Sequence, residues 1–526
     1  MSASSFAPDF IQTWPSAILI LCGVSLSYLI YSIVYNRYFH PLAKYPGPWL
    51  WTISRAPFAI SLARGDLVHD THRYHQKYGP IVRLAPNELS FIKAAAWKDI
   101  YSHRVGVPEF TKNPIWTEKT PNGVFSVINA DLDDHTRQRK ILNHAFSPTA
   151  LLAQEDLIQR YVTLLIDKIR TQDVTNITDW ITYCTFDIVG DLMFGKPFGC
   201  IEEEKYHYWV SYLFSNLKAA CIMSAVKFYP SLFWLLIKMV PKRAFKERDA
   251  HFDLSVQWVR ERVATRTERP DFLKYILDSN EKAAQPMSMP EIEASSTVLV
   301  LAGSETTATQ LLGTFTHLLQ HPSKLAKLSG EIRSRFRTEK EITLKAVDEL
   351  EYMRAVLTEN SRMAPSVPGQ VPRIVPAHGN IINGITIPPG TYVGVPQLPA
   401  YRSPLNFAHP EHFIPERWLS AESPLFTCDS SDPEFTASTF ENDEKAVLQP
   451  FSVGPRNCIG RFLANSEMRL ILARLLFVFD PEMPSRDLDK GRLRETIERK
   501  WDSQRTYALW ERNERFVKFV ERQVEV

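Results

Sequence analysis

A lone cysteine, Cys458, lies in the stretch Pro450–Arg461, which reads Pro-Phe-Ser-Val-Gly-Pro-Arg-Asn-Cys-Ile-Gly-Arg. An amphipathic helix is predicted to follow over residues 462–478, and the free amides and positive dipole at its start lower the pKa of a nearby thiol. A thiolate is a strong metal ligand. As the axial ligand of haem iron it favours cleavage of the O–O bond.

The residues around Cys458 suit such a site. Gly454 allows a tight turn beneath the ligand, and Gly460 leaves room for a flat macrocycle against the helix. Phe451 can cover the sulfur, and Arg456 is placed to meet an anionic group. These residue types at this spacing suit a protected thiolate and favour Cys458 as a metal ligand.

The alternative is that Cys458 is an ordinary buried cysteine, which is the default interpretation for the other five. Those five are Cys22, Cys184, Cys200, Cys221 and Cys428. Around Cys458, however, further residues match at fixed spacing. The pattern Phe-x-x-Gly-x-Arg-x-Cys-x-Gly resembles the haem-binding signature of the cytochrome P450 family, and the resemblance implies iron protoporphyrin IX as the cofactor.

A second motif lies in a long helix predicted from Pro290 to Gln320. Its middle, Leu-Ala-Gly-Ser-Glu-Thr-Thr-Ala-Thr, contains a glycine and several β-branched residues, which are poor helix formers. Small side chains at Ala302 allow close approach of a macrocycle. The Thr306 hydroxyl can bond back to a preceding carbonyl and open the helix locally. We expect Glu305 and Thr306 to relay protons to oxygen.

A kinked core helix is the structural alternative for this segment. The sequence also matches every position of the oxygen-activation motif of the cytochrome P450 family, Ala/Gly-Gly-x-Asp/Glu-Thr-Thr/Ser. The resemblance therefore favours a catalytic role for Glu305 and Thr306.

His135 and Arg139 are four residues apart on a basic helix, so they share one face. Such a helix is often only a solvated surface. In the family the corresponding helix holds a haem propionate, with tryptophan where this chain has His135. The resemblance implies that Arg139 and His135 bind a propionate, and that Arg373 and Arg456 are further candidates.

The same helix also carries exposed positive charge. Arg137 and Lys140, together with Arg461, could form a basic surface for an acidic electron-donating partner. That partner is expected to be NADPH-cytochrome P450 reductase, because the sequence shows no flavin or nicotinamide domain after the haem-binding region.

Glu359 and Arg362 lie three residues apart on one helix face, a weak signal by itself. The resemblance implies that both pair with Arg417 and lock the segment that precedes the cysteine loop. Ser361 and Ala364 depart from the family, which usually has leucine and an aromatic residue there.

The composition excludes several other classes of protein. The 526 residues are 44% hydrophobic and 23% charged, with a net charge of +2 that implies no nucleic-acid partner. Six cysteines without regular spacing do not form a disulfide framework and suit a reducing compartment. No linker, low-complexity run or repeat follows residue 50, so one large domain is expected in place of several.

The N-terminus reads as a membrane anchor. Residues 10–36 contain no charge, which is enough apolar chain to cross a bilayer. A cleaved signal peptide would need a basic start and a small-residue cleavage site, and neither is evident. Arg37 and Lys44 follow the span, so the positive-inside rule places the catalytic body in the cytosol. We expect a single-pass protein of the endoplasmic reticulum membrane.

We expect the chain to divide into the N-terminal anchor segment (residues 1–36), a proline-rich hinge (37–50) and a haem domain (51–526). The fold class is mainly α with small β-sheets, namely the cytochrome P450 fold after one transmembrane helix. Helices are predicted at about 149–170, 178–194, 205–240 and 247–265. A hairpin is predicted over residues 81–92, and hairpin turns at Asn383-Gly384 and Pro389-Gly390.

Finer features resemble fungal secondary-metabolism members of the family, of the isotrichodermin hydroxylase type. They are the segments 135–139 with 144–147, 185–199 and 467–470. The function implied is a haem-thiolate monooxygenase that oxidises an apolar small molecule with O₂ and NADPH-derived electrons. Terpenoid, polyketide and alkaloid scaffolds all remain open as substrates.

Two alternatives are kept: an isomerase or dehydratase that does not use O₂, and a haem-binding protein without turnover. The presence of Thr306 beside Glu305 counts against both.

Overall fold

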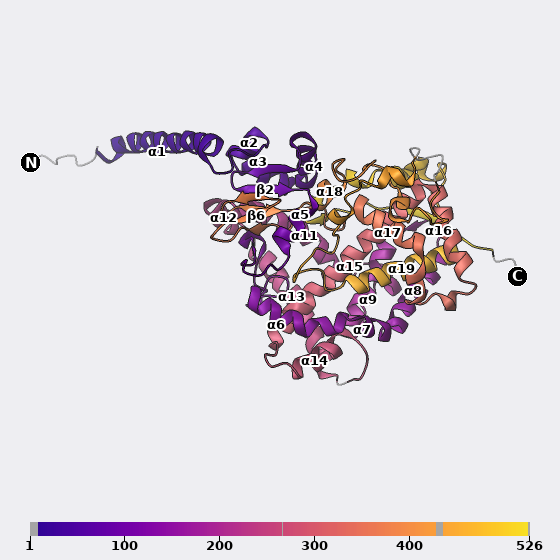
Figure 1. Cartoon of the computed structure of the whole chain (residues 1–526). Coiled ribbons are helices and arrows are strands. Elements are labelled where there is room, and N and C mark those ends of the chain that lie inside the picture. Colours follow the sequence, from indigo (N-terminus) through magenta and orange to yellow (C-terminus); the bar gives the residue numbers. More distant parts are fainter. Residues whose placement is uncertain (1–8, 266, 428–434, 524–526) are drawn as a thin grey trace, which may run out of the picture.

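Helices build most of the chain in the computed structural model, which describes residues 9–265, 267–427 and 435–523 (Figure 1). The expected mainly helical class is confirmed. The helices are α1 (Asp9–Val34), α2 (Trp49–Ile53), α3 (Ala56–Arg64), α4 (Leu67–Tyr78), α5 (Ala94–Tyr101), α6 (Leu132–Leu142), α7 (Pro148–Ala153), α8 (Glu155–Arg170), α9 (Ile177–Phe194), α10 (Cys200–Glu203), α11 (Tyr208–Lys227), α12 (Pro230–Ile237), α13 (Lys242–Ala264), α14 (Phe272–Glu281), α15 (Met289–Gln320), α16 (Pro322–Arg335), α17 (Glu351–Met363), α18 (Gln397–Tyr401), α19 (Arg461–Val478) and α20 (Arg492–Glu498).

Two of the predicted helices are each divided into two shorter helices in the structure. The span 149–170 divides into α7 and α8 at Gln154, and the span 205–240 divides into α11 and α12. Pro230 explains the second break, because proline lacks the amide donor and so starts a new helix more easily than it continues one. Helix α13 begins five residues before the predicted position 247.

Short strands form four small sheets in the described residues. The largest has the order β1-β2-β8-β5-β3. In the others β12 pairs with both β4 and β9, β6 pairs with β7, and β10 pairs with β11. The strands are β1 (Ile81–Ala85), β2 (Glu88–Phe91), β3 (Thr111–Lys112), β4 (Thr175–Asn176), β5 (Arg373–Ile374), β6 (Asn380–Ile382), β7 (Ile385–Ile387), β8 (Tyr392–Gly394), β9 (Phe479–Glu482), β10 (Thr506–Tyr507), β11 (Leu509–Trp510) and β12 (Phe516–Glu521).

Two of the three predicted hairpins are confirmed. Strands β1 and β2 pair antiparallel, and β6 joins β7 through Asn383 and Gly384. Both residues have positive φ, +50° and +72°. Asparagine and glycine tolerate that conformation best, which is why this dipeptide signals a tight hairpin. Pro389-Gly390 forms a turn but not a hairpin, because β7 pairs with β6 and β8 pairs with β2 and β5.

Helix α15 runs through the middle of the body and packs against α9, α17 and α19 (Figure 1). It starts with a capping box formed by Ser288 and Glu291 and has a proline in its first turn. Most of its later residues are buried on every side, so it is a core helix and not an amphipathic surface helix.

A buried ion-pair cluster ties α17 to the segment before the cysteine loop, as predicted. The Glu359 carboxylate accepts from Arg362 at 2.7 and 2.9 Å, from Arg417 at 3.2 Å and from the Trp418 indole at 2.9 Å. All three charged side chains have 0% exposure. Burial alone would raise the pKa of Glu359, but Arg362 and Arg417 lower it to about 2.

Replacing Glu359 with glutamine removes the anion and leaves two guanidinium groups buried. We expect Glu359→Gln to lower the free energy of unfolding by about 3–5 kcal/mol, measured by urea titration. Glu411→Gln is the matched control, since Glu411 also binds an arginine, Arg402, but is 50% exposed. A control loss as large as that of Glu359→Gln would contradict the assigned role of burial.

The predicted hinge is packed against the body. Leu42 and Tyr45 are buried with the hydrophobic cluster beneath the large sheet, and the Pro46 carbonyl accepts from the Arg83 amide at 2.8 Å. Helix α1 projects from this point (Figure 1). The candidate membrane span Leu19–Phe39 begins in α1 and continues through the π-helical turn Tyr35–Phe39, and none of it is buried. Cys428 lies outside the described residues.

Candidate active site

Cys458 lines an internal cavity whose walls come from α15, α19, the cysteine loop and the segment after α17. The cavity brings together five predicted site residues, which are Ala302, Thr306, Phe451, Cys458 and Gly460. The remaining lining is largely apolar. The cysteine signature and the oxygen motif, about 150 residues apart in sequence, thus face one space.

The cysteine loop has the geometry that its glycines predict. Gly454 has φ +78°, and a Cβ there would lie 2.2 Å from the Tyr101 carbonyl oxygen, so only glycine fits. The Cys458 amide donates to the Phe451 carbonyl at 2.9 Å, which closes the loop. A Cβ at Gly460 would meet nothing within 4 Å, so the cavity is open beside it.

The pKa of the Cys458 thiol shifts in the direction opposite to the sequence expectation. The surrounding protein raises this pKa by desolvation, and this effect outweighs the Gly460 amide, Arg139 and Arg461, which lower it as the sequence predicts for a positive environment. A cation bound at the sulfur would favour the deprotonated form, as metals do at cysteine.

A group of basic side chains surrounds the pocket lined by Arg373 and Arg456, which adjoins the cavity at Ser452 and forms its edge. His135 and Arg373 are buried, and His135 Nδ1 and Arg373 Nη1 have no hydrogen-bond partner among the described residues. Burial, Arg456, Lys112 and Arg139 lower the pKa of His135 to about 4. Burial, Arg373 and Arg456 lower the pKa of Lys112 to about 7. The nearby anion is Glu109, which is bound to Arg456, so the cations outnumber the anion.

Lys112 was not identified from the sequence. It lies opposite Arg373 in the pairing of β3 with β5, so the sheet brings two cations together from positions about 260 residues apart. A lysine in a two-residue strand has no sequence signal of its own. Only the strand register reveals it.

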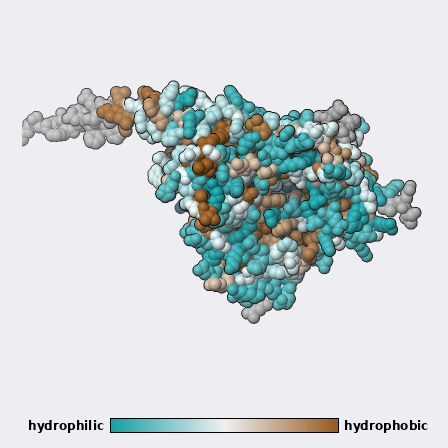
Figure 2. Space-filling model, viewed as in Figure 1, coloured by the Kyte–Doolittle hydropathy of each residue, from teal (hydrophilic) through white to brown (hydrophobic). Residues whose placement is uncertain are grey.

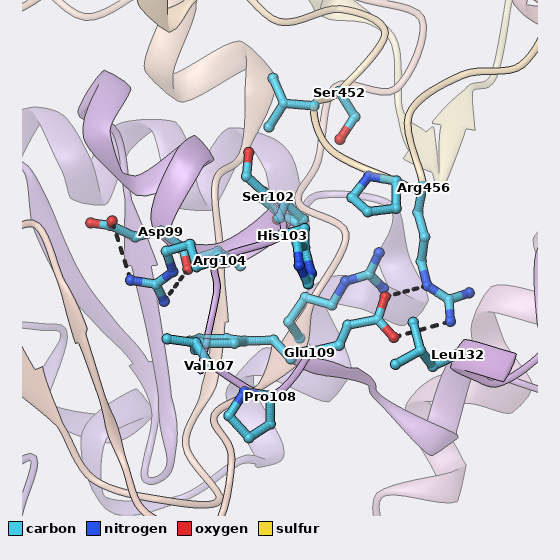
Figure 3. A pocket seen from close by; sticks show the side chains of 16 residues that line it. Asp99, Ser102, His103, Arg104, Val107, Pro108, Glu109, Leu132, Ser452 and Arg456 are labelled. Carbon is cyan, nitrogen blue, oxygen red and sulfur yellow. Dashed lines mark hydrogen bonds and ion pairs between the residues drawn. The ribbon is translucent and has the colours of Figure 1, made fainter. Parts of the chain in front are cut away.

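The other two predicted propionate ligands are already engaged. Arg456 pairs with Glu109 at 2.5 and 3.2 Å (Figure 3). It also donates to the Ala130 carbonyl at 2.9 Å. Arg139 donates to the carbonyl and side-chain oxygens of Asn457 at 2.7 and 3.0 Å. Arg139 thereby fixes the residue before Cys458, and Glu109 competes for Arg456.

These features fit a haem. A thiol faces a largely apolar cavity that is open beside Gly460, and buried donors without partners lie at its edge, where acidic propionates would satisfy them. Ser452 lines both this cavity and the neighbouring pocket that contains Arg373 and Arg456, so the two spaces adjoin.

The oxygen motif differs from expectation in one respect. Thr306 Oγ1 donates to the Ala302 carbonyl at 2.7 Å, as predicted. The helix nevertheless continues without a break from Met289 to Gln320, so the predicted local opening is absent from α15. The back-bond is accommodated inside regular helix, and Gly303 packs against Val189 on α9.

Glu305 does not face the Cys458 cavity, contrary to the simple relay expected from the sequence. Its carboxylate accepts from Arg512 at 2.6 Å in a separate pocket that includes Asp179, Tyr206 and Lys218. Burial raises the pKa of Glu305 to about 7, although Arg512 acts to lower it. Consecutive helix residues point about 100° apart at 3.6 residues per turn, so Glu305 and Thr306 face different spaces.

Arg137 is also placed differently from the prediction. It pairs with Asp134 and Glu291, so it is not available as part of a basic surface. Lys140 and Arg461 are exposed. Lys140 follows Arg139, which binds Asn457 in the cysteine loop, and Arg461 comes shortly after that loop in the sequence.

Comparisons with known proteins agree with this site. The family model described as Cytochrome P450 matches residues 45–496. Cytochrome P450 monooxygenase astJ of Aspergillus oryzae is 38% identical over 94% of this chain and 95% of its own length. Cytochrome P450 monooxygenase atr2 of Stereocaulon alpinum is 39% identical, with 95% of each chain covered. Averantin hydroxylase of Dothistroma septosporum is 39% identical over 96% and 91%.

The chain belongs to the cytochrome P450 family. It is a monooxygenase of the fungal secondary-metabolism type, an oxidoreductase whose cofactor is haem with cysteine thiolate ligation. Family members draw electrons from a redox partner and act on organic substrates. The names of the relatives support this function over the isomerase and the non-catalytic alternatives.

Substitution of the buried donors Arg373 and His135 tests whether they bind the haem propionates. We expect Arg373→Leu to accelerate haem loss on the order of tenfold or more, because one charge-assisted hydrogen bond is worth about 1.5–3 kcal/mol. His135→Leu should have a smaller effect. The rate of haem transfer to an excess of a haem-scavenging globin measures both.

Arg104→Leu is the control, since Arg104 lines the same outer pocket but binds Asp99 and Asn380 (Figure 3). Equal acceleration in Arg104→Leu and Arg373→Leu would contradict a propionate site at Arg373.

Proposed function

We propose that Cys458 is the axial ligand of the haem iron, with Phe451, Gly460 and Ala302 in contact with the macrocycle. Arg373, His135, Arg139 and Arg456 would hold the propionates, and Lys112 adds a further cation. Support comes from the shared cavity and from the buried donors at its edge. Haem with a thiolate ligand supplies reductive O₂ activation, in which one oxygen atom enters the substrate and the other leaves as water.

The proposed catalytic residues deliver protons to this cavity. Thr306 lines it and can turn its hydroxyl away from the Ala302 carbonyl. Glu305 is supported as the proton source by its pKa of about 7, which leaves it partly protonated at neutral pH. Because Glu305 binds Arg512, its side chain must leave that ion pair and swing toward Thr306 to pass a proton inward.

This relay makes a prediction about coupling. Thr306→Ala should retain haem but release several times more peroxide per NADPH, measured with a compound that the parent converts. Thr309→Val is the matched control, because the Thr309 hydroxyl makes the same kind of back-bond, to the Glu305 carbonyl, outside the cavity. Parental coupling in Thr306→Ala would contradict the relay.

The relay also has a pH dependence. Arg512 lowers the pKa of Glu305, so Arg512→Gln should raise that pKa further and keep Glu305 protonated to higher pH. The alkaline limb of product yield per NADPH should then move to higher pH. In Glu305→Gln that limb should disappear.

The proposed substrate is an apolar small molecule that the enzyme hydroxylates. Phe146, Leu299, Val367 and Val371 give the cavity an apolar wall. A relative carries the name averantin hydroxylase, which supports hydroxylation as the reaction.

The proposed electron donor is NADPH-cytochrome P450 reductase, docked on the surface that carries Lys140 and Arg461. We place the protein in the endoplasmic reticulum membrane, with residues 1–36 as anchor, 37–50 as hinge and 51–526 as a cytosolic haem domain. Arg37 and Lys44 after the span support this orientation.

Exposed apolar residues near the anchor support the proposal that this part of the body contacts the membrane. Helix α12 has no buried residues, and Trp234 and Met239 are 60% and 71% exposed. Phe228 and Tyr229, which precede α12, pack on the cluster of α2 and α3, next to the anchor. Figure 2 shows hydrophobic surface on α1 and on the adjoining part of the body.

Microsomes that contain the full chain and the reductase test the orientation. Protease added outside the vesicles should digest the haem domain, and external NADPH should reduce the haem. Protection of the domain until detergent is added would contradict a cytosolic body.

A further inference from the structure

A buried polar cluster joins α15 to α17 at the cavity wall, with the Gln310 amide at its centre. Gln310 Nε2 donates to the Ala364 carbonyl at 2.8 Å and to Ser366 Oγ at 3.1 Å. Gln310 Oε1 accepts from Asn360 Nδ2 at 3.0 Å. The single proton of the Ser361 hydroxyl is shared between the Leu357 carbonyl at 2.9 Å and Gln310 Oε1 at 3.1 Å. Both ends of the Gln310 amide thus have protein partners, so the cluster is structural and does not await a ligand.

The cluster depends on small and polar residues around it. A leucine at position 361 would remove the hydroxyl that lies within hydrogen-bond distance of Gln310 Oε1. Space is also short near Ala364, because a Cβ on Gly313 would lie 3.1 Å from the Ala364 Cβ. Ser361 and Ala364 therefore suit a polar contact between α15 and α17. In that contact Gln310 and Asn360 form hydrogen bonds where apolar packing would otherwise be expected.

On one side, the cluster reaches the backbone of Thr306, the proposed proton-relay residue. Ser366 accepts from Gln310 and donates from its own hydroxyl to the Thr306 carbonyl at 2.8 Å. In a continuous helix that carbonyl also receives the Gln310 amide. Thr306 is thus held by its backbone to the segment after α17. Its own hydroxyl bonds to Ala302.

We propose that Ser366 is a positioning residue for Thr306, and that Gln310 orients Ser366. This inference rests on the proposed role of Thr306. A second donor on the Thr306 carbonyl limits rotation of that peptide group, so the direction of the Thr306 side chain is fixed relative to the cavity wall. Ser366 and Val367 belong to that wall, so the wall and the relay hydroxyl keep one relative position.

On the other side, Asn360 connects the cluster to α17, the helix that carries the buried Glu359 ion pair. Asn360 Nδ2 donates to the Gln310 carbonyl at 2.9 Å, and Asn360 Oδ1 lies 2.9 Å from His317 Nδ1. Burial lowers the pKa of His317 to about 3, so the ring is neutral and donates from Nδ1. Asn360 follows Glu359, so Thr306 is connected to the buried ion-pair helix through direct hydrogen bonds.

Carbon monoxide bound to the reduced holoenzyme is a suitable probe, because its infrared stretching band responds to donors in the cavity. We expect Thr306→Ala to shift the band and Ser366→Ala to broaden it or shift it in the same direction. Ser366→Thr, which keeps the hydroxyl, should restore the parental band. Ser361→Ala is the control, since Ser361 also binds Gln310 but does not reach Thr306.

Hydrogen–deuterium exchange of the holoenzyme gives a second readout without turnover. Peptides that cover residues 302–310 should exchange several times faster in Ser366→Ala than in the parent or in Ser366→Thr. A shifted band in Thr306→Ala with parental band and exchange in Ser366→Ala would overturn the positioning role alone. A parental band in Thr306→Ala would overturn the relay, and this inference with it.

Discussion

The buried charge of Glu359 constrains the rest of the structure. A carboxylate with no exposure is tolerated only where cations and donors surround it, and Glu359 has Arg362, Arg417, the Trp418 indole and the Ile414 amide. These contacts fix the segment 408–418 against α17. Asp443 accepts from Arg417 at 2.7 Å, which adds the segment before the cysteine loop to the same network. The chain that leads to Cys458 is thus tied to a carboxylate about 100 residues earlier in the sequence.

The opposite electrostatic situation holds at the edge of the cavity. There His135, Lys112 and Arg373 gather with Glu109 as the nearby anion, and Glu109 is already bound to Arg456. Burial without compensation lowers the pKa of each of these basic groups. The buried cations at this edge therefore destabilise the protein without haem, and binding of an anionic cofactor offsets that cost. The Glu359 cluster stabilises the fold, whereas the cations at the cavity edge favour cofactor binding.

Much of this could be predicted from the sequence because the signals are local. The cysteine loop requires glycine at position 454, where φ is positive and the Tyr101 carbonyl is close. The glycine in the sequence pattern therefore predicts the tight turn. The Asn383-Gly384 hairpin and the proline-capped start of α15 are similar cases. Their conformations are set by the residues themselves.

The remaining features depend on partners far away in the sequence. Glu305 faces Arg512, Arg456 faces Glu109, and Lys112 lies beside Arg373 through strand pairing. No periodicity in the chain encodes these contacts. The Ser361 and Ala364 departures are a further example, because their reason becomes visible only when Gln310 is seen between the two helices.

We propose that Cys458 binds the haem iron through its thiolate. The direct measurement is the absorption spectrum of the reduced, carbon-monoxide-bound protein for the parent, Cys458→Ala and the control Cys200→Ala, a buried cysteine outside the cavity. We expect a far-red-shifted Soret band in the parent and in the control, and its loss in Cys458→Ala. A shifted band that survives in Cys458→Ala, or an unshifted band in correctly folded parent protein, would contradict this proposal.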